Sequence, residues 1–309
     1  MVAFDEVNQE RLFLVIGGTG AQGGSTARQL LERGHRVRVL VRNPSKASEL
    51  ASLGAEVFHG NIDNPAEVKA SLENVTDVFA IPLLHWNEPE RETRNALTLI
   101  QAARQAGVRH FVQTSVVGAG NHKHNPRAGT GYWNEQYWES KWQIEELVRN
   151  AGFAAYTILK PAMFMENFLA PMVDFMYPTL RQGTLVTAIA PDTRIQLIAV
   201  DDIGALAVAA FEKPDLYAGK TIELAADALT MEEIAHRLTA ATGRAVQAIS
   251  LSPQEALAQG RTLVREDEWL NEVGHHASIQ EAASYGVPLT SFQQWTAAHA
   301  GFITIHMSV

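Results

Sequence analysis

"VIGGTGAQGGSTARQLLERG", residues 15–34, holds six glycines: five follow an apolar run closely, and the sixth ends a segment with helical spacing. Gly17, Gly20 and Gly23 follow a G-x-x-G-x-x-G pattern. Glycines so spaced let the chain turn tightly, let a pyrophosphate approach the backbone and let the following helix pack closely on the strand. That helix directs free N–H groups and the positive end of its dipole at the turn. The stretch therefore predicts a dinucleotide-binding turn between the first strand and the first helix.

Outward from this turn, short apolar segments alternate with helical ones. The predicted strands are residues 12–16, 36–41, 55–58, 77–81, 109–114 and 155–159. Helical segments between them end at Gly34 and Gly107, where glycine tolerates the left-handed backbone that closes a helix. The strands are almost continuously apolar, as expected where helices cover both faces of a sheet. The alternation predicts an α/β fold with a doubly wound parallel sheet.

After residue 160 the alternation weakens. Thr230 with Glu233, and Ser252 with Glu255, have the spacing of capping boxes at helix starts. We expect a dinucleotide-binding domain over residues 1–160 and a smaller, mostly helical lobe over 161–309, of which about 196–212 returns to the main sheet. Residues 118–136 are rich in glycine and asparagine, which favours either a functional loop or a disordered one.

The end of the second predicted strand indicates which dinucleotide binds. An acidic residue there would bind a ribose 2′-hydroxyl, whereas an arginine accommodates a 2′-phosphate. The sequence is VLVRNPSK, with Arg42 at the strand end, Lys46 four residues later and no carboxylate before Glu49. Two solvated surface cations are the alternative interpretation. The pattern favours NADP(H) over NAD(H).

Composition limits the remaining classes of function. The 309 residues carry a formal net charge of −9 and no long basic run, which argues against direct nucleic-acid binding. There is no cysteine, so disulfides and thiolate chemistry are excluded. The N-terminus has acids where a secretory signal carries positive charge, and no apolar run is long enough to span a bilayer; we expect a cytoplasmic protein without a membrane segment. His122 and His124 lie in a polar loop without neighbouring carboxylates, so we expect no metal site.

Five segments, in their order and spacing, resemble the NmrA-like family, an atypical branch of the short-chain dehydrogenase/reductases, and most of all its members of the human redox-sensor type. These segments are GGTGAQGGSTA (17–27), RNPSKASELASLGAEVFHGNIDN (42–64), SKWQIEE (140–146), KPAMFMENF (160–168) and VDDIGALA (200–207). The resemblance covers nearly the whole chain. It implies a Rossmann domain, a small C-terminal lobe and a cleft between them.

The resemblance also implies that NADP(H) is bound by residues spread along the chain. The residues that it implies as cofactor contacts are Gly17, Thr19, Gly20, Ala21, Gln22, Gly23, Arg42, Lys46, Asn61, Ile62, Pro82, Lys141, Pro161 and Phe164.

Tyr137 and Lys141, in YWESK, are four residues apart and share one face of a predicted helix. In the dehydrogenases that this chain resembles, such a lysine binds the nicotinamide ribose and lowers the pKa of the tyrosine, whose phenol exchanges a proton with a carbonyl oxygen. Ser115, near the end of the fifth strand, would complete the catalytic set by orienting the substrate, although the resemblance implies a hydroxyl closer to Val116. The alternative is that Ser115 is only a hydrogen-bonding residue at the strand end. Alternatively, Tyr137 belongs to an aromatic packing face with Trp138 and Trp142.

Two functions follow, because the family contains both reductases and regulators. The first is an NADPH-dependent reductase of a small apolar carbonyl or quinone-like substrate, favoured by Tyr137 and by the apolar segment AMFMENF, 162–168. The second is a non-enzymatic redox sensor, in which NADP(H) orders the 118–136 loop and thereby regulates a partner protein.

Overall fold

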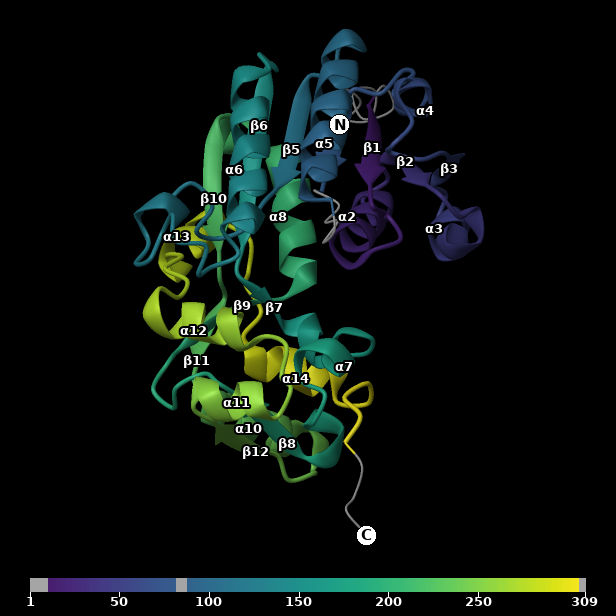
Figure 1. Cartoon of the computed structure of the whole chain (residues 1–309). Coiled ribbons are helices and arrows are strands. Elements are labelled where there is room, and N and C mark those ends of the chain that lie inside the picture. Colours follow the sequence, from purple (N-terminus) through teal and green to yellow (C-terminus); the bar gives the residue numbers. More distant parts are fainter. Residues whose placement is uncertain (1–10, 82–87, 306–309) are drawn as a thin grey trace. The chain divides into compact units, whose positions relative to one another are not determined.

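The computed structural model describes residues 11–81 and 88–305. It divides the chain into two compact units (Figure 1). The first unit is Met1–Gly120, Gln136–Lys160 and Val200–Glu223, and the second is Asn121–Glu135, Pro161–Ala199 and Leu224–Val309. We expected a boundary at residue 160 and a return to the main sheet over about 196–212. In the structure the returning segment is 200–223, and residues 121–135 belong to the second unit.

A seven-stranded sheet with the order β10-β6-β5-β4-β1-β2-β3 forms the centre of the first unit. Its strands are β1 (Leu12–Ile16), β2 (Arg36–Val41), β3 (Glu56–His59), β4 (Asp77–Ala80), β5 (His110–Thr114), β6 (Ala155–Pro161) and β10 (Lys220–Leu224). The pairings from β6 through β3 are all parallel. The predicted doubly wound parallel sheet is confirmed, and the six predicted strands lie within two residues of their observed bounds.

Helices cover both faces of this sheet (Figure 1). They are α2 (Ala21–Glu32), α3 (Ser48–Ser52), α4 (Pro65–Ser71), α5 (Pro89–Gln105), α6 (Glu135–Asn150), α8 (Val200–Glu212) and α9 (Pro214–Tyr217). On one face, Leu99 of α5 and Val148 of α6 share a core with Leu14 of β1. On the other face, Phe211 of α8 packs edge-on against Phe13 of β1, with ring centroids 5.1 Å apart. Successive residues of β1 are thus buried on opposite faces, which explains why the strand is apolar throughout.

Helices α2 and α8 lie close together because small residues face each other between them. Gly204 of α8 leaves no room for a side chain: a Cβ there would lie 2.6 Å from Ser25 Oγ. Ser25 Oγ donates to Asp201 Oδ1 at 2.6 Å, and Gln29 Nε2 donates to the Asp201 carbonyl at 2.8 Å. The contact fixes the start of α8 against the middle of α2.

The second unit contains two small sheets and short helices. The sheets have the orders β11-β9-β7 and β12-β8. The elements are β7 (Met163–Phe164), α7 (Met172–Met176), β8 (Thr184–Thr187), β9 (Ile195–Ile198), β11 (Asp227–Leu229), α10 (Met231–Thr242), β12 (Gln247–Ser250), α11 (Pro253–Ala258), α12 (Val264–Glu272), α13 (Ile279–Ser284) and α14 (Phe292–His299). Both predicted capping boxes are present, at Thr230 and at Ser252. Among the described residues no helix combines the length and the apolar character that crossing a membrane requires.

Candidate functional site

The glycine turn brings the N-terminus of α2 against the end of β1. Gly17 has a φ of 71°, and its carbonyl accepts from the Gly20 N–H at 2.8 Å. A Cβ on Gly23 would lie 2.4 Å from the Gly17 oxygen, so the helix approaches the strand as closely as two main chains allow. Gly20 is the N-cap of α2 and supplies no side-chain cap. The first turn therefore keeps N–H groups for an external acceptor.

The residues of this turn fit the pyrophosphate of a dinucleotide. Thr19, Gly20 and Ala21 are exposed, so an anion can reach the main chain. Gln22 Oε1 is buried and has no hydrogen-bond partner in the described part of the chain. Because a buried acceptor without a partner is costly, a ligand hydroxyl or amide that donated to it would stabilise the site. The pattern of glycines predicted Gly20 for this turn, and the family resemblance implied Thr19, Ala21 and Gln22.

Arg42 and Lys46 follow β2 and are both exposed. Within residues 11–81 and 88–305, neither side chain makes a hydrogen bond or an ion pair. Asn43 between them caps the short helix 44–47, because its Oδ1 accepts from Ser45 N at 3.1 Å and from Ser45 Oγ at 2.7 Å. Glu49 points to another cation, Arg28, at 3.8 Å. The strand end thus offers two cations and no adjacent carboxylate, a charge pattern that suits a phosphate.

The turn after β3 is held by its own polar groups. Asn61 Oδ1 accepts from Asp63 N at 3.2 Å, the Asn61 N–H donates to Glu67 Oε2 at 2.7 Å, and Ile62 is buried. Arg91 of α5 donates to both Asp63 oxygens, at 2.8 and 2.6 Å, and this pairing holds the pKa of Asp63 well below its usual range. Pro82 lies outside the described residues.

Tyr137 and Lys141 face each other on α6, with Lys141 Nζ 4.9 Å from the centroid of the tyrosine ring. Lys141 is buried, and its ammonium donates to a carboxylate that the sequence interpretation missed, Glu92 Oε1 of α5. Ser140 Oγ donates to the other Glu92 oxygen at 2.9 Å. Burial lowers the pKa of Lys141, and Glu92 opposes that effect. Burial, with the negative charge of Glu92, raises the pKa of Tyr137 to about 12.

The expectation that Lys141 lowers the pKa of Tyr137 is therefore wrong for this structure. The main physical reason is burial, which disfavours the charged phenolate, and the Glu92 carboxylate paired with Lys141 raises the pKa of Tyr137 further. Tyr137 also contacts Trp138 edge-on, with centroids 5.3 Å apart, so its ring is part of an aromatic contact as well.

Ser115 donates a hydrogen bond to another buried carboxylate, Glu145 of α6. Its Oγ donates to Glu145 Oε1 at 2.6 Å, and Arg149 donates to Glu145 Oε2 at 2.7 Å. Lys160, at the end of β6, lies 3.7 Å from Glu145 and donates to the Ala119 carbonyl at 2.6 Å. The Ser115 hydroxyl is thus part of the hydrogen-bond network around Glu145, all of whose residues belong to the first unit.

Pro161 and Phe164 belong to the second unit. Pro161 is buried at the end of β6, and Phe164 is half-buried in β7, where it pairs with Ile198.

The sequence contains a signal from which Glu92 and Glu145 could have been identified as buried carboxylates. Glu92 occupies the stripe of α5 that continues through Leu99 and Ala103, and Glu145 occupies the stripe of α6 that continues to Val148; all of these residues are buried. A carboxylate on an apolar helical stripe needs a partner.

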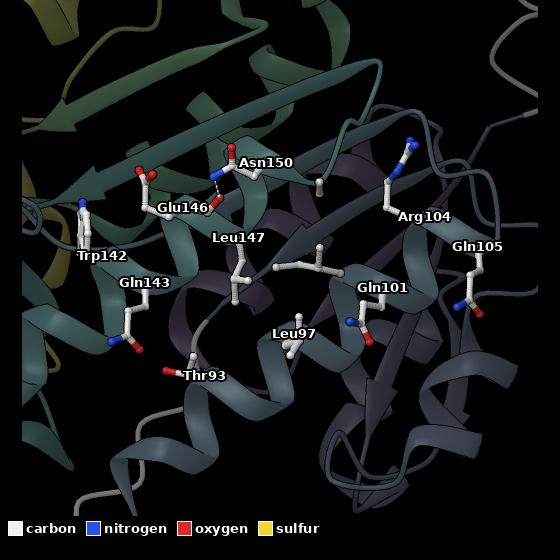
Figure 2. A pocket seen from close by; sticks show the side chains of 12 residues that line it. Thr93, Leu97, Gln101, Arg104, Gln105, Trp142, Gln143, Glu146, Leu147 and Asn150 are labelled. Atoms are coloured by element: carbon white, nitrogen blue, oxygen red, sulfur yellow. Dashed lines mark hydrogen bonds between the residues drawn. The ribbon is translucent and has the colours of Figure 1, made fainter.

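The outer sides of α5 and α6 form a groove of about 880 Å³ (Figure 2). Its lining residues are Thr93, Leu97, Ile100, Gln101, Arg104, Gln105, Trp142, Gln143, Glu146, Leu147, Asn150 and Ala151. None of the predicted site residues lines it. The same two helices therefore present a largely apolar groove at one place and the Glu92–Lys141–Tyr137 cluster at another.

Comparison with known proteins gives a consistent result. The chain is 30% identical over 246 residues to an NAD(P)H azoreductase of Xenophilus azovorans, an alignment that covers 79% of each protein. The triphenylmethane reductase of Citrobacter sp., solved with NADP(H), matches with a TM-score of 0.76 at 19% identity, over 94% of this chain and 99% of that one. NmrA, a negative transcriptional regulator solved with NADP, matches with a TM-score of 0.72 at 18% identity, over 94% and 95%.

At such identities the two structural matches show a shared fold. The model of the NmrA-like family matches residues 9–292, nearly the whole chain. The chain therefore belongs to the NmrA-like family.

Proposed function

We propose that this chain is an NADPH-dependent reductase of a small apolar carbonyl or quinone-like substrate. The observation that carries the proposal is the Tyr137–Lys141 pair on α6, because a phenol beside an ammonium is a group that can give a proton to a substrate oxygen. The uncapped start of α2 supports pyrophosphate binding, and the unpaired Arg42 and Lys46 support the choice of NADP(H).

Reduction of a carbonyl needs one hydride and one proton. A bound reduced nicotinamide would supply the hydride to the carbonyl carbon, and the electrons of the C=O π bond would pass to the oxygen. The carbonyl oxygen then takes the phenolic proton of Tyr137, and solvent returns a proton to the phenolate. With a pKa of about 12 the Tyr137 phenol is protonated at neutral pH, as an unperturbed tyrosine also is, so its proton is available to the carbonyl oxygen. Lys141 keeps further N–H groups for a ribose hydroxyl, since Glu92 accepts from it at one oxygen.

The expected substrate is aromatic or aliphatic. Met163 and Phe164, the two residues of β7, are half-buried and therefore present part of an apolar surface. The relatives named as an azoreductase and a triphenylmethane reductase also favour an extended aromatic substrate.

Tyr137→Phe tests the role of the phenol. We expect this variant to lose NADPH-dependent turnover of its best quinone or carbonyl by about 10²–10⁴-fold, the usual contribution of a positioned general acid. The affinity for NADPH should not change. The measurement is NADPH oxidation at 340 nm over a panel of aldehydes, ketones and quinones, with Tyr156→Phe, a half-buried tyrosine of β6, as the matched control. Turnover that survives in Tyr137→Phe contradicts the proposal.

A second candidate is an NADP(H) sensor, favoured by the position of the Ser115 hydroxyl, which donates to Glu145. In this role the cofactor would change the surface of the loop 118–136. Arg127 pairs with Glu272 at 2.7 Å and the Tyr132 hydroxyl donates to Glu268 at 2.8 Å, so these contacts with α12 would have to change. Limited proteolysis of this loop with and without NADPH tests the sensor role. Binding of NADPH with no turnover but with altered cleavage supports it, and unaltered cleavage contradicts it.

A further inference from the structure

Glu92 is the buried charge that the proposed reaction leaves unexplained. Its side chain is 0% exposed, in the first turn of α5. Both carboxylate oxygens accept from neighbouring residues of α6: Lys141 Nζ donates to one, and Ser140 Oγ donates to the other at 2.9 Å. The carboxylate is thus fixed in orientation as well as in place.

Stability of the fold alone does not explain why Glu92 and Lys141 form a buried ion pair. Two buried charges lose their hydration, and a well-packed apolar pair in their place is often at least as stable. Leu99 and Ala103 show that the same stripe of α5 accepts apolar residues further along. The position of Glu92 is special because its partner, Lys141, also contacts the ring of Tyr137. The charged groups of the described residues that face Tyr137 are Lys141 on its own helix and Glu92 on α5.

Glu92 affects the ionisation of Tyr137 because of the order in which Lys141 and Tyr137 lose their protons. Because burial lowers the pKa of Lys141 while that of Tyr137 is raised, the ammonium loses its charge before the phenol ionises. During ionisation of the phenol, the remaining charge beside it is the Glu92 carboxylate. A negative charge disfavours the phenolate.

We propose that Glu92 is a positioning residue, which neutralises Lys141 and holds Tyr137 in its protonated, proton-donating form up to alkaline pH. This inference rests on the proposed function for its catalytic meaning. The effect of Glu92 on the ionisation of Tyr137 involves only residues of the first unit. It can therefore be measured without substrate or cofactor.

The test is a pH titration of the whole chain labelled with [¹³Cζ]tyrosine and followed by NMR. The chain has six tyrosines, and Tyr137→Phe identifies the signal of Tyr137. In the unsubstituted protein this signal should stay at the phenol position to about pH 10.5. In Glu92→Gln the acid dissociation constant of Tyr137 should rise roughly tenfold, so that the signal moves toward the phenolate position at lower pH.

Two further variants separate charge from structure. Glu90→Gln makes the same chemical change at an exposed residue of the same helical turn and should titrate like the unsubstituted protein. Glu92→Asp retains the carboxylate and should restore most of the original titration. For an active preparation, the reductive kcat/KM of Glu92→Gln should begin to fall at lower pH than that of the unsubstituted protein.

An unchanged Tyr137 titration in folded Glu92→Gln overturns the inference. If this variant does not fold, the unsubstituted protein still decides, because half-ionisation of Tyr137 at or below about pH 10, the ordinary value for tyrosine, overturns the inference as well. If the signal shifts as expected but no carbonyl or quinone is reduced, the proposed reaction fails while the electrostatic role of Glu92 stands.

Discussion

A single buried imidazole illustrates how one residue links packing to pH. His110 lies on β5, 5.2 Å from the ring of Phe211, and burial lowers its pKa to about 4. Thr157 Oγ1 donates to the Tyr217 carbonyl at 3.0 Å, so it accepts from His110 Nε2 at 3.1 Å. The Nδ1 atom is then the unprotonated nitrogen, and it is buried without a partner in the described residues. Adding a proton there is unfavourable.

His110 therefore makes the first unit sensitive to acid. Its folded pKa of about 4 is below the value of 6.5 for an unperturbed histidine, so the unfolded chain binds the proton first. Stability from this residue is complete above about pH 6.5 and is lost as the pH falls toward 4. In His110→Gln, the slope of unfolding free energy against pH in this window should decrease by about 1.4 kcal/mol per pH unit. Denaturant titrations check this, with the exposed His59→Gln as control; equal slopes in all three proteins contradict it.

At the scale of elements, α5 and α6 each carry one carboxylate into the core of the first unit. Glu145 accepts from Ser115 and Arg149 and lies near Lys160, so it joins the ends of β5 and β6 to the middle of α6. Glu146, its neighbour, is 41% exposed and pairs with the same Arg149 at 2.6 Å. Glu145 and Glu146 thus allow a buried ion pair to be compared with a more exposed one on the same helix.

We expect Glu145→Gln to lower the free energy of unfolding by about 3 kcal/mol, because it removes the buried negative charge beside Arg149 and Lys160. The loss is at the lower end for a broken buried ion pair, because Arg149 keeps Glu146 and Lys160 keeps Glu223 as counter-charges. Glu146→Gln should change the free energy of unfolding by less than about 0.5 kcal/mol. Chemical denaturation followed by circular dichroism measures both. Equal losses in the two variants would show that burial of the carboxylate is not what matters.

How much of the fold could be predicted from the sequence depends on the element. Five of the six predicted strands lie inside the sheet, where both faces are covered, and their sequences are mostly apolar. The sixth, β3, is an edge strand with Glu56 and His59 exposed, and only Val57 and Phe58 gave it an apolar signal. The edge strand β10 was missed because Lys220 and Thr221 are exposed and its apolar residues alternate with polar ones. The glycine turn could be predicted from local spacing. Glu92 could not be paired with Lys141, because the two are 49 residues apart and only the packing of α5 on α6 brings them together.

At the scale of the whole molecule, the residues expected to bind the dinucleotide are divided between the two units. The glycine turn, Arg42, Lys46 and Lys141 belong to the first unit, whereas Pro161 and Phe164 belong to the second. The uncapped start of α2 lies in the first unit, as do Arg42 and Lys46, whose side chains are unpaired among residues 11–81 and 88–305. Preference for NADPH over NADH should therefore depend on the first unit, and on Arg42 in particular.

Isothermal titration calorimetry of the full chain with NADPH and with NADH tests the central claim most directly. We predict tighter binding of NADPH, and a loss of about 10–100-fold in NADPH affinity in Arg42→Ala, the value of one or two charge-assisted hydrogen bonds. NADH affinity should change little in the same variant. Absence of heat with either dinucleotide, or equal affinities for both that Arg42→Ala leaves unchanged, would contradict the account.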